Sequence, residues 1–96
     1  MDETERKRLS KKTCALKYNS DEPAPRLISK GKGMDAEKII EEASRNGIPV
    51  ISDDNLADNL YRLQINEFIP EELFEIIAAI YSYVMKKKEN RNEKED

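Results

Sequence analysis

The chain has 96 residues, 38% hydrophobic and 39% charged, which is enough for one small domain with a modest core. Its single cysteine excludes an internal disulfide and fits a reducing compartment, and the absence of histidine excludes histidine-based catalysis and histidine metal sites. No apolar run approaches the ~20 residues of a membrane span and no apolar leader follows the charged N-terminus, so the sequence predicts a cytoplasmic protein.

The net charge of −3 is unevenly distributed along the chain. Residues 1–18 carry six Lys and Arg against three Asp and Glu, whereas residues 19–85 carry six against thirteen. The acidic middle disfavours a nucleic-acid surface there and favours attraction to a basic segment. One alternative stays open, namely a small nucleic-acid or nucleotide-binding regulator that uses the basic N-terminal arm and the Lys-Gly turn at residues 30–33.

The N-terminal third predicts a charged arm followed by two strands. Residues 1–12 lack periodicity and are interpreted as a flexible arm. Residues 13–18 alternate in polarity, which predicts a strand, and the loop composition of residues 19–25 separates it from a second strand at residues 26–30. The two strands are expected to pair antiparallel across this loop.

The middle of the chain predicts a helix and a third strand. From Asp35, which can cap the first turn, the apolar period becomes helical, and Gly47 suits the left-handed position after the helix. The apolar run 48–51 then predicts a strand, joined to the preceding strand by a right-handed crossover. Pro49 lacks a backbone donor, which places this strand at an edge or Pro49 at its start.

Two further helices are predicted after Asp53 and after Pro70, the second one reaching about Lys87. Residues 89–96 form a charged segment that is expected to be disordered. The sequence therefore predicts one α/β domain over residues 13–88, with a small mixed sheet of about three strands and three packed helices, and a monomer.

The last helix carries two apolar stripes. One contains Leu73, Ile77 and Ile80, and the other contains Phe74, Ala78, Tyr81 and Met85. The stripes lie roughly 110° apart, so the apolar arc is wider than packing on one side requires. From the pattern alone, the second stripe either packs inside the domain or forms an exposed contact surface.

Other residues that could bind ligands have simpler structural interpretations. The Lys-Gly turn could hold a phosphate but lacks the spacing of a P-loop, and a strand-to-helix turn is the favoured interpretation. Asp53, Asp54 and Asp58 could bind a cation, although capping of the helix is favoured. Cys14 is interpreted as a small apolar residue rather than a reactive thiol. We therefore predict no metal site and no cofactor.

Several short segments, in colinear order, resemble the cytoplasmic domain of the flagellar type III export protein FlhB and its injectisome relatives YscU, SpaS and EscU. They span residues 13–87: Ala15-Leu16-Lys17-Tyr18, Ala24-Pro25-Arg26-Leu27-Ile28-Ser29-Lys30-Gly31, Ala36-Glu37-Lys38-Ile39, Asn46-Gly47-Ile48-Pro49-Val50, Leu56-Ala57 with Leu60-Tyr61, and Ile69-Pro70-Glu71-Glu72-Leu73-Phe74. Each segment is weak, and their order and spacing make the resemblance specific.

The sequence departs from this family at the position of self-cleavage. The family cuts itself at an Asn-Pro-Thr-His motif, and the aligned residues here are Arg8-Leu9-Ser10-Lys11. The asparagine that cyclises is absent, so we expect no self-cleavage and no enzyme activity. The alternative of a self-cleaving enzyme is disfavoured for the same reason. Without the family's membrane part and preceding strand, the chain resembles a stand-alone protein beginning near the start of the cleaved C-terminal fragment.

The resemblance implies a docking module of the flagellar export apparatus, which would substitute for or regulate the FlhB C-terminal fragment in substrate docking and specificity switching. Its expected partners are export-gate proteins, export substrates and membrane-anchored FlhB, with no nucleic acid. In the family, an apolar patch between a loop and the last helix is thought to receive substrates. Combined with the second stripe, this implies a partner-binding set of six residues: Ala24, Pro25, Phe74, Ala78, Tyr81 and Met85.

Overall fold

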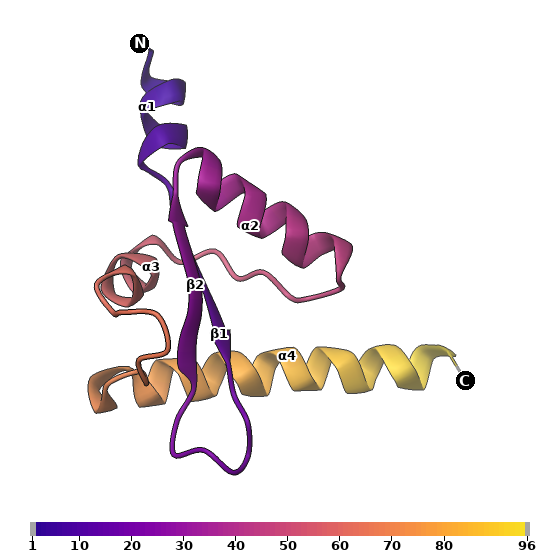
Figure 1. Ribbon diagram of the computed structural model, residues 1–96. Coiled ribbons are helices and arrows are strands. Elements are labelled where there is room, and N and C mark those ends of the chain that lie inside the picture. Colours follow the sequence, from indigo (N-terminus) through magenta and orange to yellow (C-terminus); the bar gives the residue numbers. More distant parts are fainter. Residues whose placement is uncertain (1, 96) are drawn as a thin grey trace.

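The computed structural model describes the backbone of residues 2–95 and the side chains of residues 2–87, and it is a mixed α/β fold (Figure 1). The elements in chain order are α1 Glu3–Ser10, β1 Lys12–Lys17, β2 Arg26–Lys32, α2 Met34–Arg45, α3 Asp54–Tyr61, the 3-10 turn η1 Glu71–Leu73, and α4 Phe74–Glu95. A two-stranded hairpin crosses the long last helix, and two of the shorter helices, α2 and α3, lie against the hairpin.

The predicted hairpin is confirmed, whereas the predicted third strand is wrong. β1 and β2 pair antiparallel, with a β-bulge after Ala15, and the sheet of the described residues contains these two strands alone. The run Ile48–Ile51 is extended but forms no ladder, so the parallel crossover is absent as well. Its side chains are exposed, with Ile48 at 58%. Apolar composition alone does not make a strand, because a strand also needs hydrogen bonds to a neighbouring strand, and this run forms no such ladder.

The turn from β2 into α2 follows from two glycines. Gly33, at φ 63°, is the N-cap of α2, and Asp35 lies in the first turn rather than at the cap as predicted. A Cβ on Gly31 would lie 2.9 Å from the Cβ of Asp35, so the small residue lets α2 start close to the strand. At the other end Gly47, at φ 68°, takes the predicted left-handed position, and the Ile48 N–H donates to the Ala43 carbonyl at 2.9 Å.

The charged N-terminal segment contains a helix that the sequence pattern did not predict. Asp2 caps α1 by accepting a hydrogen bond from the Glu5 N–H at 2.8 Å, and basic residues occupy the last turn, which suits the helix dipole. Arg8 donates two hydrogen bonds to the Glu37 carboxylate, at 2.6 and 3.2 Å, and thereby links α1 to α2. The hydrogen bond from Arg8 lowers the pKa of Glu37.

Helix α3 is held by a cap at its start and by charged side chains of the hairpin. Asp53 caps α3 by accepting a hydrogen bond from the Leu56 N–H at 3.0 Å, which confirms the capping interpretation. The Lys30 ammonium donates to the carbonyls of Tyr61 and Leu63, at 3.0 and 2.8 Å, and so neutralises the negative end of α3. Lys12 binds Asp58 at 2.9 Å.

The core lies where the hairpin, α3 and the start of α4 meet. Leu27 is completely buried at its centre, and the surrounding cluster consists of Ala24, Leu56, Leu60, Leu63, Ile69 and Ile77. The segment after α3 covers the outer edge of β2, because the Leu27 N–H donates to the Glu67 carbonyl at 2.9 Å and the Asn66 N–H donates to the Leu27 carbonyl at 2.6 Å. This arrangement holds the hairpin loop beside α4.

Helix α4 is longer than predicted. It was expected to end near Lys87, with a disordered tail over residues 89–96, but its backbone stays helical to Glu95. Lys, Glu and Arg dominate this part of the sequence, and all three favour helix. Residue 96 lies outside the described residues. No helix in the described part of the chain is both long and apolar enough to cross a membrane.

Candidate functional site

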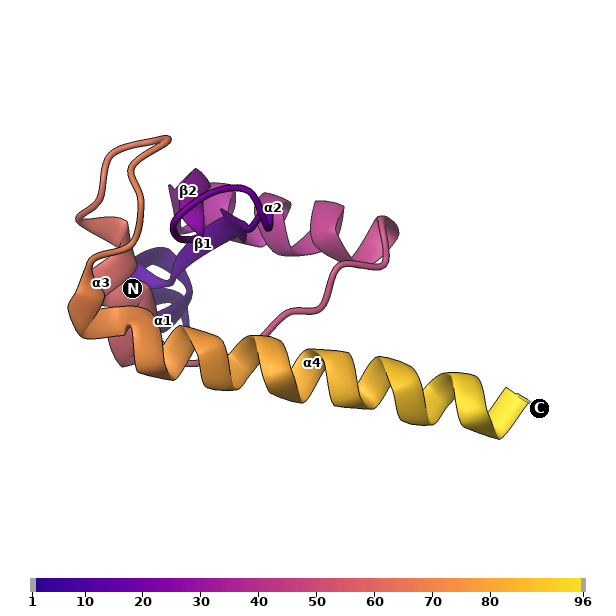
Figure 2. The same cartoon turned by 90° about the horizontal axis from the view of Figure 1, so that it is seen from below.

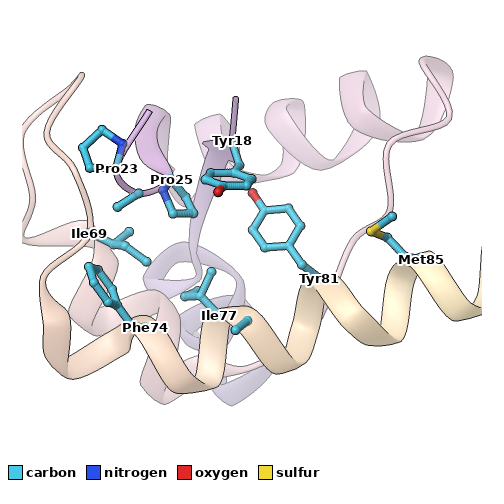
Figure 3. Close-up of a pocket in the computed structure, with 10 residues that line it drawn as sticks. Tyr18, Pro23, Pro25, Ile69, Phe74, Ile77, Tyr81 and Met85 are labelled. Carbon is cyan, nitrogen blue, oxygen red and sulfur yellow. The ribbon is translucent and has the colours of Figure 1, made fainter. Parts of the chain in front are cut away.

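A groove with a volume of about 380 Å³ opens between the hairpin loop and α4 (Figure 3). The figure shows side chains from α4 and side chains from the loop pointing toward the same space, with Tyr18 and Tyr81 beside each other. The residues that line the groove are Tyr18, Pro23, Ala24, Pro25, Ile69, Phe74, Ile77, Ala78, Tyr81 and Met85.

The α4 wall is the second apolar stripe of that helix. Phe74, Ala78, Tyr81 and Met85 follow one another at helical spacing, and the buried Ile77 contributes from the neighbouring stripe. Phe74 is 42% exposed and Met85 is 62% exposed. Phe74 and Met85 are therefore exposed in the groove, whereas Tyr81 lines the groove and also packs, partly buried, against the core. The stripe thus serves both alternatives that the pattern left open.

The loop wall is held in place by the backbone. The Pro25 carbonyl accepts a hydrogen bond from the Ile69 N–H at 2.9 Å, which ties the loop to the segment that leads into α4. Ala24 is 5% exposed and anchors the loop in the core. Farther out, the Asn19 amide donates to Glu22 at 2.7 Å and closes the turn. Since proline has a fixed φ, Pro23 and Pro25 make this wall stiff before any partner binds.

Two tyrosines connect the walls. The ring centroids of Tyr18 and Tyr81 are 6.0 Å apart, with an angle of 47° between the planes, which is within the range of favourable aromatic pairs. Partial burial raises the pKa of Tyr81. The two hydroxyls are the only polar side-chain groups of the lining, so they can orient a partner whose contact is otherwise apolar.

The mostly apolar lining is suited to binding. No group of three or more His, Cys, Asp and Glu in residues 2–95 is placed to hold a metal ion. The aspartates considered for a cation have other roles, since Asp53 caps α3 and Asp58 binds Lys12. Burial raises the pKa of the Cys14 thiol, with an opposing effect from Lys30, which fits the interpretation of Cys14 as a small apolar residue.

All six residues of the predicted partner-binding set lie in this one groove, although they come from segments about fifty residues apart in sequence. Their role in binding stays a prediction. Tyr18, Pro23, Ile69 and Ile77 also line the groove and were not included in that set. Tyr18 directly precedes the predicted loop and Pro23 lies within it, which was a usable signal, whereas the contribution of Ile69 depends on how the chain folds back before α4.

The sequence of this chain matches the family described as the FlhB HrpN YscU SpaS Family over residues 11–84. It is 39% identical over 77 residues to the uncharacterized protein YlqH of Bacillus subtilis, with 79% of this chain and 83% of YlqH covered. It is 41% identical over 76 residues to the flagellar biosynthetic protein FlhB of Aquifex aeolicus. That match covers 77% of this chain and 22% of FlhB, so the chain spans about a fifth of that relative's length.

Solved structures show the same architecture. A mutated EscU/SpaS C-terminal domain superposes with a TM-score of 0.74 at 32% identity, covering 78% of this chain and 95% of that domain. The PscU C-terminal domain superposes with a TM-score of 0.70 at 23% identity, covering 76% of this chain and 95% of that domain, which shows the shared fold. The family match, the relatives and the fold agree with the resemblance drawn from the sequence. The chain belongs to the FlhB HrpN YscU SpaS Family.

Proposed function

We propose that this chain is a non-enzymatic docking module of a flagellar type III export apparatus, which substitutes for or regulates the C-terminal fragment of FlhB. The observation that carries the proposal is the groove, because a preformed, mostly apolar groove on a member of this family is suited to accepting a segment of another protein. Substrate docking and the switch between substrate classes are the functions that such a groove would serve in the cytoplasm.

The dimensions and polarity of the groove favour a peptide segment with apolar side chains. Its floor holds the buried Ile77, while Phe74 and Met85 are exposed on the α4 wall and could close over an inserted side chain. A helix or extended segment with apolar residues at regular spacing would fit along α4. The expected partners are export substrates, export-gate proteins and membrane-anchored FlhB.

The nucleic-acid alternative gains no support from the arrangement of the cations. Arg8 binds Glu37, Lys12 binds Asp58 and Lys30 binds carbonyls at the end of α3. These three groups serve internal contacts and are therefore not free to bind phosphate, which needs several cations that point to solvent together.

Complementation of motility tests the proposal. A motile strain whose FlhB lacks its cytoplasmic C-terminal portion would express this chain in trans, either unchanged or with Tyr81→Asp or Tyr83→Asp. We expect the unchanged chain to restore motility and Tyr81→Asp to abolish it, because a charge in the groove would weaken partner binding by about tenfold or more. Tyr83 is 52% exposed on the same helix and is not among the groove residues, so Tyr83→Asp is the matched control.

Each result has a defined meaning when circular dichroism shows that the variants are folded. Equal motility with Tyr81→Asp and Tyr83→Asp would contradict the role of the groove. A folded, unchanged chain that restores no motility would contradict substitution. A pull-down with this chain as bait would then test whether it regulates the apparatus by binding FlhB or export substrates. Capture of neither partner would contradict the regulatory role as well.

A further inference from the structure

The groove between α4 and the hairpin loop carries opposite charges at its two ends. In Figure 3 its α4 wall runs from Phe74 to Met85. Two exposed carboxylates, Glu71 and Glu75, lie at the Phe74 end, and the exposed Lys86 directly follows Met85. Charged groups beside an apolar surface favour a partner with the opposite charge at the same place, so the two ends of the groove select different ends of the partner.

Helical geometry places the two carboxylates in line with groove residues. Glu71 begins the 3-10 turn η1, and its carbonyl accepts the Phe74 N–H, so it lies one turn before Phe74 on the same side. Glu75 lies one turn before Ala78 in α4. The salt bridges among the side chains that the structure describes include none with Glu71, Glu75 or Lys86. All three charges can therefore pair with a partner.

The walls of the groove offer no continuous row of backbone donors to an extended partner. The backbone groups of α4 are bonded within the helix. In the loop wall, Pro23 and Pro25 have no N–H, and the Pro25 carbonyl already accepts the Ile69 N–H at 2.9 Å. An extended segment in this apolar groove would leave its own backbone groups unpaired, whereas a helix satisfies them internally.

Building on the proposed function of the groove, we infer that its occupant is an amphipathic helix of another protein that lies antiparallel to α4. This helix has acidic residues in its first turn and basic residues in its last turn. The antiparallel direction brings the basic turn to Glu71 and Glu75 and the acidic turn to Lys86. It also opposes the dipoles of the two helices, and the same end charges stabilise the partner helix itself.

The length of the charged groove sets the length of the partner. A helix needs about four turns to reach from Glu71 to Lys86. Figure 2 shows that α4 continues past the hairpin, so a longer partner has room to extend beyond Met85. Its apolar residues should recur at i, i+3, i+4 and i+7, because this spacing places them in one row toward the groove.

A second copy of this chain does not supply such a helix. The apolar stripe of its α4 already faces its own hairpin loop, and the apolar side of α2 packs on the hairpin, where Ile39 approaches Gly31. Helix α1 has the required order of charges, but its one apolar residue is Leu9. Helix α3 has no basic residue in its last turn. The occupant is therefore a helix of a different protein.

Paramagnetic labelling of a synthetic helix tests the direction of binding. The probe is the blocked peptide Glu-Glu-Leu-Ala-Ala-Leu-Leu-Ala-Gln-Leu-Ala-Ala-Lys-Lys, with a nitroxide on a cysteine added at one end or the other. A label at the lysine end should broaden the amide NMR signals of Phe74 and Glu75, and a label at the glutamate end should broaden those of Met85 and Lys86. The reverse pattern, or broadening of both ends by either label, would overturn the inference.

A proline-containing peptide tests whether the occupant is helical. It has proline in place of the alanine that follows the paired leucines, which keeps every leucine and both charged ends but interrupts the helix. Fluorescence anisotropy should show that this peptide binds at least about tenfold more weakly than the probe. Equal affinity of the two peptides would mean that the groove accepts an extended segment, and the inference would be wrong.

Paired substitutions test the charges at the Phe74 end. Glu71→Gln combined with Glu75→Gln should weaken binding of the probe about threefold at low salt, because two ion pairs are lost, and high salt should remove the difference. A probe that ends in Gln-Gln should not respond to these substitutions. Asp54→Asn is the matched control, since it removes a first-turn carboxylate from α3, outside the groove lining. Equal weakening of both probes by the glutamine substitutions would contradict the charge pairing.

The groove variants separate failure of this inference from failure of the proposed function. Tyr81→Asp should abolish binding of the probe, and Tyr83→Asp should leave it unchanged. Binding in the wrong direction that Tyr81→Asp still abolishes would overturn the inference and leave the groove as a docking site. Binding that Tyr81→Asp does not change would place the probe elsewhere and overturn the inference, as would a probe that fails to bind. In both cases the motility experiment tests the groove independently, because it uses no peptide.

Discussion

At the scale of single residues, two adjacent apolar residues of one strand can differ greatly in burial. Leu27 and Ile28 are adjacent apolar residues of β2, but Leu27 is completely buried and Ile28 is 42% exposed. Successive strand residues face opposite sides of a sheet, and the side chain of Leu27 packs in the core cluster that includes Leu56 and Ile77.

Leu27→Ala should therefore destabilise the domain far more than Ile28→Ala. The first substitution leaves a cavity in the core and should cost about 2–5 kcal/mol in the free energy of unfolding. The second removes a partly exposed side chain and should cost less than about 1 kcal/mol. Urea denaturation of both variants measures the difference, and equal midpoints would show that Leu27 is not at the centre of the core.

The binding set also shows what residue patterns can predict. Helical spacing alone predicts the stripe of Phe74, Ala78, Tyr81 and Met85. Helical spacing cannot predict how exposed these side chains are, because exposure depends on which other elements cover them. The loop residues Ala24 and Pro25 were assigned through the family resemblance. Ile69 could not be predicted, since its place in the groove depends on the hydrogen bond from its N–H to Pro25.

At the scale of elements, glycines and caps explain where the helices begin and end. Asp53 caps α3 and Gly47 ends α2 as their residue types predict. The run 48–51 fails as a strand for a different reason. Its composition suits a strand, but a strand needs a partner with free backbone groups, and the sequence of one segment does not contain that information.

The two glycines with positive φ should respond differently to alanine. Gly47→Ala should cost about 1 kcal/mol in the free energy of unfolding, because its φ is 68° and no atom lies within 4 Å of the added Cβ. Gly33→Ala has a similar φ of 63° and would place its Cβ 3.1 Å from the Leu9 carbonyl oxygen, so it should cost more. Urea midpoints of the two variants check this order, and a larger loss for Gly47→Ala would contradict it.

At the scale of the whole molecule, the segment aligned with the family's cleavage motif, residues 8–11, covers the end of α1 and the residue that joins α1 to β1. Arg8 is in α1 and holds Glu37, and the Lys11 carbonyl accepts a hydrogen bond from Gly33. We propose that this segment is structural in this chain. Neither residue has the side-chain amide that cyclises in the family's reaction.

The purified chain should therefore stay uncut. Intact mass spectrometry after prolonged incubation at neutral and mildly alkaline pH should give a single species with the mass of the full chain. As a control, a relative that retains the Asn-Pro-Thr-His motif should yield two fragments under the same conditions. A fragment that begins near Lys11 would contradict this prediction and would return the self-cleaving alternative to consideration.

The sequence by itself determined the local elements and the family. Helical spacing and turn residues predicted the hairpin, the helices α2, α3 and α4, and the stripe of Phe74, Ala78, Tyr81 and Met85, because these features depend on neighbours along the chain. The order of short segments indicated the family, and the family resemblance added Ala24 and Pro25. The tertiary structure alone decided that the second stripe of α4 lines an open groove and that the run 48–51 stays unpaired. Exposure and strand pairing depend on which distant segments meet, and a single segment cannot encode its partner's position.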